Sequence, residues 1–153
     1  DNDYRKSYSS NKFKGGGVGL DLSHEFDYIT WIFGKFKKIN IINKKISNLS
    51  INSNDHLMLN ATFGSNTFLN ITLNYYSHIP HRYLIIDFND CTLHVDIINY
   101  QIKIKYNDRD LIIKKWTKND RNTSYTKMHK SIINNKFENI CSYNQALEYL
   151  NII

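Results

Sequence analysis

A strict alternation of apolar and polar residues constrains the fold of this chain more than any other sequence feature. The alternation runs through residues 57–63, 69–75, 93–97 and 100–106. Successive side chains of a β-strand point to opposite faces, so each run predicts a strand with one apolar and one polar face. Strands of this kind belong to antiparallel sheets that are covered on one side.

Other segments complete the predicted order of elements. We expect further strands near 38–46, 82–88 and 110–116, a turn at 64–66, and helices over 18–34, 122–137 and 142–153. Residues 1–14 are polar with scattered aromatics and predict a loop or extended arm. The fold class is therefore α+β, with one large, mainly antiparallel sheet and helices packed on one face. The regular alternation and the absence of an internal repeat predict a single domain over residues 1–153.

The two ends of the chain suggest that it is part of a longer protein. Residue 1 is Asp, and residues 145–153 form an amphipathic helical pattern that stops without a terminating Gly or Pro. We therefore expect further sequence beyond this chain.

Charge and apolar content exclude several classes of protein. The net charge of +6 fits either a nucleic-acid partner or lysines scattered over solvated faces. No nucleic-acid-binding motif is present, so we expect no nucleic-acid partner. No apolar run approaches the roughly 18 residues of a membrane helix, so we expect no membrane partner. Two cysteines predict a reducing, cytoplasmic location, and His78 and His81 lack Cys partners at zinc-site spacing, so we expect no metal.

The predicted helix over residues 20–34 has two distinct faces. An apolar stripe faces the core, and a polar face collects a histidine, two carboxylates and two aromatics: Asp21, His24, Asp27, Tyr28 and Trp31. One interpretation is an acid/base histidine oriented by a carboxylate, with aromatic walls around a ligand. The other is a capped helix N-terminus with a half-buried polar face, and helical spacing alone does not separate the two.

A glycine cluster precedes this helix. Gly15, Gly16, Gly17 and Gly19 do not fit the dinucleotide fingerprint G-x-G-x-x-G, and no strand comes before them. Glycines at the start of a helix let backbone N–H groups approach a ligand closely. Gly16 and Gly17 are therefore candidates for ligand binding.

Three stretches together carry a resemblance to a known family. They are D-Y-R-K-S-Y at residues 3–8, G-G-G-V-G-L-D-L-S-H-E-F-D-Y at residues 15–28, and W-I-F-G at residues 31–34. The chain resembles the C-terminal domain of the glucose–fructose oxidoreductase / inositol dehydrogenase (Gfo/Idh/MocA) family. These stretches are similar to the branch that acts on sugars and nucleotide sugars in polysaccharide biosynthesis. The likeness extends over the whole chain, but only the first 34 residues are specific.

The resemblance implies a two-domain enzyme that transfers a hydride from a sugar hydroxyl carbon to NAD or NADP. It implies that an N-terminal Rossmann domain, absent from this chain, binds the cofactor, and that cofactor-binding residues are absent from this fragment. This chain would be the substrate-binding and oligomerisation domain, inactive alone. The family's E-K-P motif is missing, and the single proline is Pro80. A non-catalytic carbohydrate-binding or dimerisation module is the alternative.

The resemblance also implies roles for individual residues. His24 and Asp21 correspond to an acid/base pair, although the spacing here is D-x-x-H where many members have D-x-x-x-H. The implied substrate-binding residues are Tyr4, Arg5, Tyr8, Gly16, Gly17, Asp27 and Tyr28. The arm carrying Tyr4, Arg5 and Tyr8 fits a solvated segment packed on the domain equally well.

The polar faces of the strands predict a partner surface. The face opposite the predicted core carries few carboxylates, and its residues include Asn70, Thr72, Asn74, Lys103 and Lys105. Asn and Thr side chains can pair across a two-fold axis, and the family resemblance implies the same surface. We therefore expect a homo-oligomer through the sheet. A solvated open face on a monomer remains the alternative.

Overall fold

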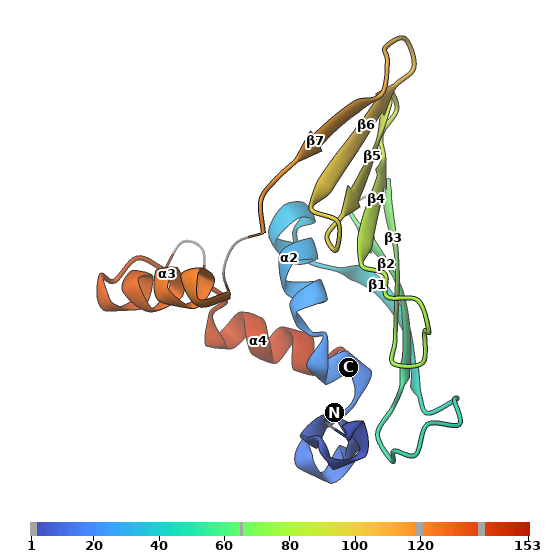
Figure 1. Cartoon of the computed structure of the whole chain (residues 1–153), viewed down its shortest axis with the longest axis vertical. Helices are drawn as coiled ribbons and strands as arrows, with labels where there is room; N and C mark the ends of the chain where they lie inside the picture. Colours follow the sequence, from blue (N-terminus) through green and yellow to red (C-terminus); the bar gives the residue numbers. More distant parts are fainter. Residues whose placement is uncertain (1–2, 65, 119–120, 138–139) are drawn as a thin grey trace. The chain divides into compact units, whose positions relative to one another are not determined.

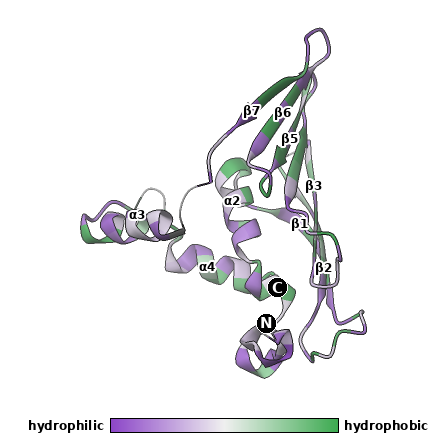
Figure 2. Cartoon of the chain, viewed as in Figure 1, coloured by the Kyte–Doolittle hydropathy of each residue, from purple (hydrophilic) through white to green (hydrophobic). Residues whose placement is uncertain are grey.

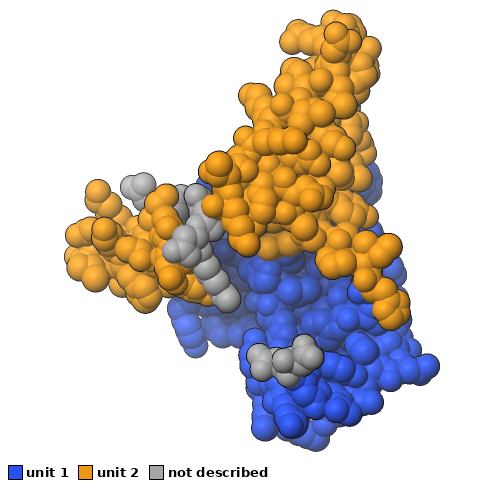
Figure 3. Space-filling view, viewed as in Figure 1, with its two compact units in different colours: residues 1–77, 137–153 blue, residues 78–136 orange. Residues whose placement is uncertain are grey.

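A computed structural model describes residues 3–64, 66–118, 121–137 and 140–153 of the 153-residue chain. These residues divide into two compact units, shown in Figure 3. Unit 1 comprises residues 1–77 and 137–153, and unit 2 comprises residues 78–136. Figure 1 labels the main elements of both units.

Unit 1 begins with an arm and two helices. The arm, expected as a loop or an extended segment, forms three single-turn 3₁₀ helices, η1 (Tyr4–Lys6), η2 (Tyr8–Ser10) and η3 (Lys12–Lys14). The side chain of Asp3 caps η1 by accepting from the backbone N–H of Arg5, and that of Asn11 caps η3 by accepting from Phe13. Short polar caps of this kind stabilise local turns over an extended chain. Helices α1 (Val18–Asp21) and α2 (His24–Phe33) follow.

The predicted continuous helix is therefore wrong in one respect, because a turn at Leu22 and Ser23 separates α1 from α2. Leu22 leaves the helical region, with φ −104° and ψ 22°. The predicted end at Gly34 is confirmed, because this glycine caps α2 with a φ of +88°, a conformation that residues with a Cβ rarely adopt.

A three-stranded antiparallel sheet completes unit 1 with helix α4 (Tyr143–Leu150). Its strands, in the order β1-β2-β3, are β1 (Lys37–Lys44), β2 (His56–Phe63) and β3 (Thr67–Asn74). The predicted turn between β2 and β3 includes Ser65, which lies outside the described residues; its neighbours Gly64 and Asn66 form a turn. Hydrophobic and hydrophilic residues are interspersed along these strands and helices (Figure 2).

The core of unit 1 lies between the apolar face of this sheet and the helices. Its buried side chains come from α1, α2, α4, β2 and β3: Val18, Phe26, Ile29, Leu57, Leu59, Ala61, Phe63, Ile71 and Tyr149. Phe33 and Phe63 stack at 5.5 Å between ring centroids, and Phe36 lies 5.3 Å from Phe63. The predicted apolar stripe of α2 and the one-sided coverage of this sheet are thus confirmed.

Unit 2 contains a four-stranded antiparallel meander and helix α3 (Arg121–Ile133). Its strands, in the order β4-β5-β6-β7, are β4 (Tyr83–Asp87), β5 (Cys91–Asp96), β6 (Gln101–Tyr106) and β7 (Ile112–Lys115). The register gives the sheet one aliphatic face, formed by Leu84, Ile86, Leu93, Val95, Ile102 and Ile104. Among the described residues, every buried hydrophobic side chain nevertheless belongs to unit 1.

The α+β class and the seven predicted strands are confirmed, but the strands form two sheets instead of one. Residues 75–82, which include Pro80, separate β3 from β4. Lys103 and Lys105 therefore lie in a different sheet from Asn70, Thr72 and Asn74. The partner surface predicted from the sequence combined residues of both sheets, and its members fall into two separate sets.

Candidate functional site

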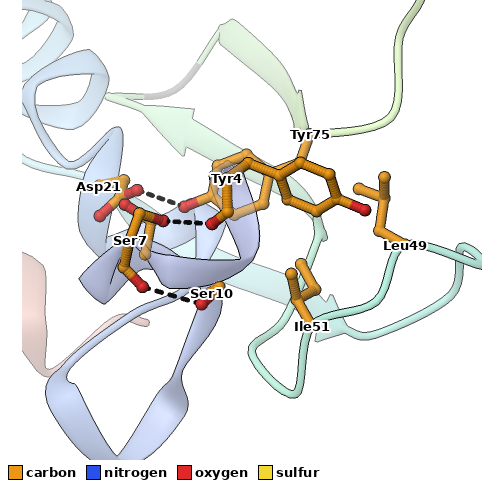
Figure 4. A pocket seen from close by; sticks show the side chains of 8 residues that line it. Tyr4, Ser7, Ser10, Asp21, Leu49, Ile51 and Tyr75 are labelled. Carbon is orange, nitrogen blue, oxygen red and sulfur yellow. Dashed lines mark hydrogen bonds between the residues drawn. The ribbon is translucent and has the colours of Figure 1, made fainter. Parts of the chain in front are cut away.

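A cavity of about 430 Å³ lies in unit 1 beside the arm. Four segments line it: the arm, α1, the loop between β1 and β2, and the residue that follows β3. Figure 4 shows Asp21 at one side of this cavity and Leu49 and Ile51 at the other. Its lining residues are Tyr4, Ser7, Ser9, Ser10, Asp21, Leu49, Ile51 and Tyr75.

Hydrogen bonds between the arm and the β1–β2 loop hold two walls of the cavity together. The backbone carbonyl of Ser10 accepts from the N–H groups of Asn52 and Ser53 at 3.1 and 3.3 Å. The Ser53 hydroxyl donates to the Ser9 carbonyl at 2.6 Å, and Lys12 N–H donates to the Asn52 side chain at 2.9 Å. The arm is therefore fixed to the loop by both main-chain and side-chain bonds.

Asp55 fixes the loop from inside. Its side chain is fully buried and accepts hydrogen bonds from the Ile46 N–H at 2.8 Å and the Ser47 hydroxyl at 2.5 Å, and Lys45 Nζ lies 2.9 Å away. Burial alone would raise the pKa of Asp55, but the bonds from Ser47, Ile46 and Lys45 outweigh it and lower the pKa to about 2. The carboxylate therefore stays ionised and organises the loop.

Gly16 explains how the arm reaches this position. A Cβ added to Gly16 would lie 2.4 Å from the carbonyl oxygen of Tyr8 and 2.5 Å from that of Ser9. The backbone of the arm thus occupies the space next to Gly16, while buried Gly17 has a φ of +133° and faces Asn54. The glycines therefore allow two parts of the chain to approach each other closely. This geometry gives no support to the prediction that Gly16 and Gly17 contact a ligand.

Tyr75 fixes the orientation of Asp21. The Tyr75 hydroxyl donates to Asp21 Oδ2 at 2.5 Å, and the Tyr75 N–H donates to the Asp55 carbonyl at 3.0 Å. Burial and the bond to Asp21 both raise the pKa of Tyr75, which keeps its proton on the phenol. The other carboxylate oxygen, Asp21 Oδ1, is buried and has no hydrogen-bond partner among the described residues.

His24 does not share the cavity with this pair. It begins α2 with half of its side chain exposed, and its Nε2 lies 3.2 Å from Oε1 of the buried Glu25. The cavity lining includes Asp21 but does not include His24. Because the turn at residues 22–23 interrupts the helix, the spacing argument that put Asp21 and His24 on one helix face does not apply across it.

Asp27 and Tyr28 are engaged inside unit 1. The Tyr149 hydroxyl, from α4, donates to Asp27 Oδ1 at 3.3 Å and lies 2.6 Å from the Thr30 hydroxyl. The half-buried ring of Tyr28 packs against the core cluster. Both residues contribute to packing within unit 1, and neither lines the cavity.

The remaining predicted residues lie at the surface of the arm and of α2. Tyr4 lines the cavity, and its hydroxyl accepts from the Ser50 N–H at 3.4 Å. Arg5 forms a bidentate pair with Asp3, with Nε at 2.7 Å and a terminal nitrogen at 2.9 Å from the carboxylate. Tyr8 and Trp31 are exposed and do not line the cavity.

The described residues do not supply a nucleotide-cofactor fold or a metal cluster. All of their strand pairings are antiparallel, whereas dinucleotide sites are built on parallel βαβ units. Within the described ranges, no three His, Cys, Asp or Glu side chains gather as metal ligands. No helix in this part of the chain is long and apolar enough to span a membrane.

Sequence reasoning missed most of the cavity. It assigned Tyr75 to the apolar face of a strand and gave no role to Ser7, Leu49 or Ile51. One signal pointed to Tyr75: a tyrosine at the end of an apolar stripe needs a hydrogen-bond partner for its hydroxyl when it is buried. The loop residues carry no comparable signal, because their positions depend on long-range contacts with the arm.

Comparison with known proteins identifies the fold. The sequence matches no protein-family model and no curated protein. UDP-N-acetylglucosamine 3-dehydrogenase from Acidithiobacillus ferrooxidans matches with a TM-score of 0.65, 18% identity and 78% of this chain covered. An oxidoreductase from Agrobacterium radiobacter, solved with NAD⁺, L-tartaric acid and magnesium, matches with a TM-score of 0.62, 16% identity and 76% coverage. A candidate oxidoreductase of Thermotoga maritima matches with a TM-score of 0.65, 12% identity and 84% of this chain covered.

The chain spans only part of these structures: 39%, 35% and 40% of their respective lengths. It therefore has the fold of one portion of larger oxidoreductases. At the level of fold, this confirms the resemblance predicted from the sequence.

Proposed function

We propose that residues 1–153 act as one domain, the substrate-binding and assembly domain of an NAD(P)-dependent oxidoreductase acting on a sugar or nucleotide sugar. The observation that carries the proposal is the shared fold with UDP-N-acetylglucosamine 3-dehydrogenase. The cavity beside Asp21 supports it, because its volume lies in the range of small-molecule sites. The two free cysteines, Cys91 and Cys141, fit a cytoplasmic enzyme.

In this proposal the cofactor is NAD or NADP, held mainly by an N-terminal Rossmann domain outside this chain. When bound, the nicotinamide accepts the hydride that leaves the sugar carbon. The antiparallel sheets described above support this division, since they contain no dinucleotide-binding unit. Residues 1–153 alone should then bind neither cofactor in calorimetry and should be inactive. Micromolar binding would remove this part of the proposal.

His24 is the proposed proton acceptor for the substrate hydroxyl. An imidazole exchanges protons near neutral pH, and the exposed ring of His24 is open to a substrate. Buried Glu25, 3.2 Å from Nε2, would orient the ring and stabilise its protonated form. In the role that the sequence suggested for it, Asp21 would instead act from within the cavity, held by Tyr75.

The test uses the full-length protein, with UDP-N-acetylglucosamine and other nucleotide sugars as substrates and absorbance of the reduced cofactor as the signal. His24→Ala should lower turnover by roughly 10²–10⁴-fold. The matched control is His129→Ala, because His129 is exposed on α3 and lies outside the proposed site. Wild-type turnover in a folded His24→Ala protein would remove His24 from the mechanism. Failure of all nucleotide sugars and sugars to reduce either cofactor would favour the non-catalytic binding module.

A further inference from the structure

The cavity in unit 1 has an unusual charge composition for a site that would receive part of a nucleotide sugar. Its described lining contains one carboxylate, Asp21, and no Lys, Arg or His side chain. Arg5, the cation that the sequence suggested for a phosphate, lies outside the lining and is paired with Asp3. An anionic group placed here would face a carboxylate without a compensating cation, which is unfavourable at short range.

The carboxylate is held in place from an independent element. Tyr75 follows β3, its N–H is fixed by the Asp55 carbonyl, and its hydroxyl donates to Asp21 Oδ2 at 2.5 Å. The phenolic proton is committed to Asp21 Oδ2, and the other carboxylate oxygen, Asp21 Oδ1, is buried without a hydrogen-bond partner among the described residues, so it can only accept. Tyr75 and Asp21 therefore favour ligand groups that donate hydrogen bonds, such as hydroxyls.

The rest of the lining suits an uncharged ring. Figure 4 shows the rings of Tyr4 and Tyr75 between Asp21 on one side and Leu49 and Ile51 on the other. Aromatic and aliphatic walls bury C–H surfaces, while tyrosine and serine hydroxyls offer hydrogen bonds at the edges. A ring with C–H faces and a hydroxyl rim matches both kinds of surface.

We propose that Tyr75 and Asp21 make this cavity selective for an uncharged hydroxylated ring over its anionic counterpart, with Tyr75 positioning the Asp21 carboxylate. The inference rests on the proposed function and narrows its substrate: an uncharged ring enters the cavity, and the reacting hydroxyl and any phosphate groups lie outside it, where the ring of His24 is exposed. Tyr75 is then a specificity-determining residue contributed by the end of β3.

The test compares D-glucose with D-glucuronate, which share a ring and differ in one carboxylate. Both are titrated into the 153-residue chain while NMR signals of the backbone amides are followed. Glucose should shift amides of the cavity lining, and glucuronate should bind at least about tenfold more weakly, as expected for a like charge at short range. Equal binding of the two probes, binding of neither, or shifts confined to residues outside the cavity would overturn the inference.

Two variants identify the residues responsible. Asp21→Asn keeps the shape of the side chain and removes its charge, so the discrimination against glucuronate should largely disappear. Tyr75→Phe removes the positioning hydroxyl and should weaken glucose binding several-fold and reduce the discrimination. Tyr143→Phe is the control, because Tyr143 is an exposed residue of α4 outside the lining. Unchanged discrimination in both cavity variants would contradict the assignment.

Failure of this inference is distinguishable from failure of the proposed function. A full-length protein that oxidises a nucleotide sugar, while its cavity ignores the charge of the probe, retains the function and loses the inference.

Discussion

At the scale of single residues, the buried Asp55 carboxylate links the loop geometry to pH. Its pKa of about 2 in the folded chain lies below the ordinary value of 3.8. A depressed carboxylate pKa contributes stability above the unfolded-state pKa, and this contribution disappears as pH falls through the folded-state pKa. The window of loss therefore runs from about pH 4 to about pH 2, and the contribution is about 2 kcal/mol.

Asp55→Asn should remove this pH dependence, because the amide does not titrate in the window. The measurement is the free energy of unfolding in urea at several acidic pH values, for wild type and variant. The difference between them should shrink as pH falls towards about 2. Asp108→Asn is the matched control, since Asp108 is 80% exposed. A constant difference between wild type and Asp55→Asn across the window would contradict the prediction.

The fold also depends on the absence of a side chain at Gly16. In Gly16→Ala the new methyl group would collide with the carbonyl oxygens of Tyr8 and Ser9, which are backbone atoms and cannot rotate away. The variant should lose about 1–3 kcal/mol of stability, and the arm should move away from the β1–β2 loop. Limited proteolysis of the arm and urea unfolding measure the two effects.

Gly15→Ala is the comparison for Gly16→Ala. Gly15 has a φ of +78°, but a Cβ added there would meet no atom within 4 Å, so its variant reports backbone strain without collision. A stability loss in Gly16→Ala no greater than that in Gly15→Ala would show that the collision is relieved.

At the scale of elements, the contact between α4 and α2 joins residues more than 100 positions apart, so local sequence patterns do not predict it. The side chain of Tyr149, only 7% exposed, places its hydroxyl between the Thr30 hydroxyl and the Asp27 carboxylate. Tyr149→Phe keeps the packing of the ring and removes these bonds, so it should cost about 1–2 kcal/mol in urea unfolding. Tyr143→Phe, in the same helix but 76% exposed, should change little. Equal effects of the two variants would show that the buried hydroxyl contributes nothing.

The helices and strands also show how much of the fold could be predicted from the sequence. Four of the seven strands, β2, β3, β5 and β6, follow from alternation, since a half-buried strand imposes period two on its own residues. The turn at Leu22 and Ser23 could not be predicted, because neither Gly nor Pro marks it and both residues are compatible with a helix. The division into two sheets was also hidden: alternation reveals which face of a strand is apolar but not which strand is its neighbour.

The residues of the candidate site also divide into those that the sequence predicted and those that it did not. Tyr4 and Asp21 were found because they belong to the recognisable first 34 residues. Tyr75 comes from 54 residues further along the chain than Asp21, and only the folded sheet brings the two together.

At the scale of the whole molecule, we expect self-association through the outer face of the β1–β3 sheet. This face carries Asn60 and Asn70, which are hydrogen-bonded at 2.9 Å, and the exposed Thr72, and its register residues include no carboxylate. Sedimentation over tens to hundreds of micromolar, a range that spans weak interfaces, should show concentration-dependent association. A strictly monomeric 18.1 kDa species throughout would contradict the prediction.

Thr72→Lys should weaken that association, because a two-fold interface brings the new charges of both copies near each other. Thr126→Lys on α3 adds the same charge outside the sheet and should leave association unchanged. Equal effects of the two variants would move the interface away from this face.

The division of unit 1 into residues 1–77 and 137–153 has a consequence for synthesis on the ribosome. The hydroxyl contact between Thr30 and Tyr149 spans 119 positions. The first segment of unit 1 therefore cannot complete its core until all of unit 2 and then α4 have been translated. Until then the aromatic core beneath α2 lacks one of its buried side chains, and β2 and β3 lack part of their cover. The β4–β7 meander, whose strands pair only with their sequence neighbours, has no such delay. A released chain that ends after residue 136 would therefore hold one formed meander and one incomplete core, whose exposed apolar surface is open to proteases and chaperones.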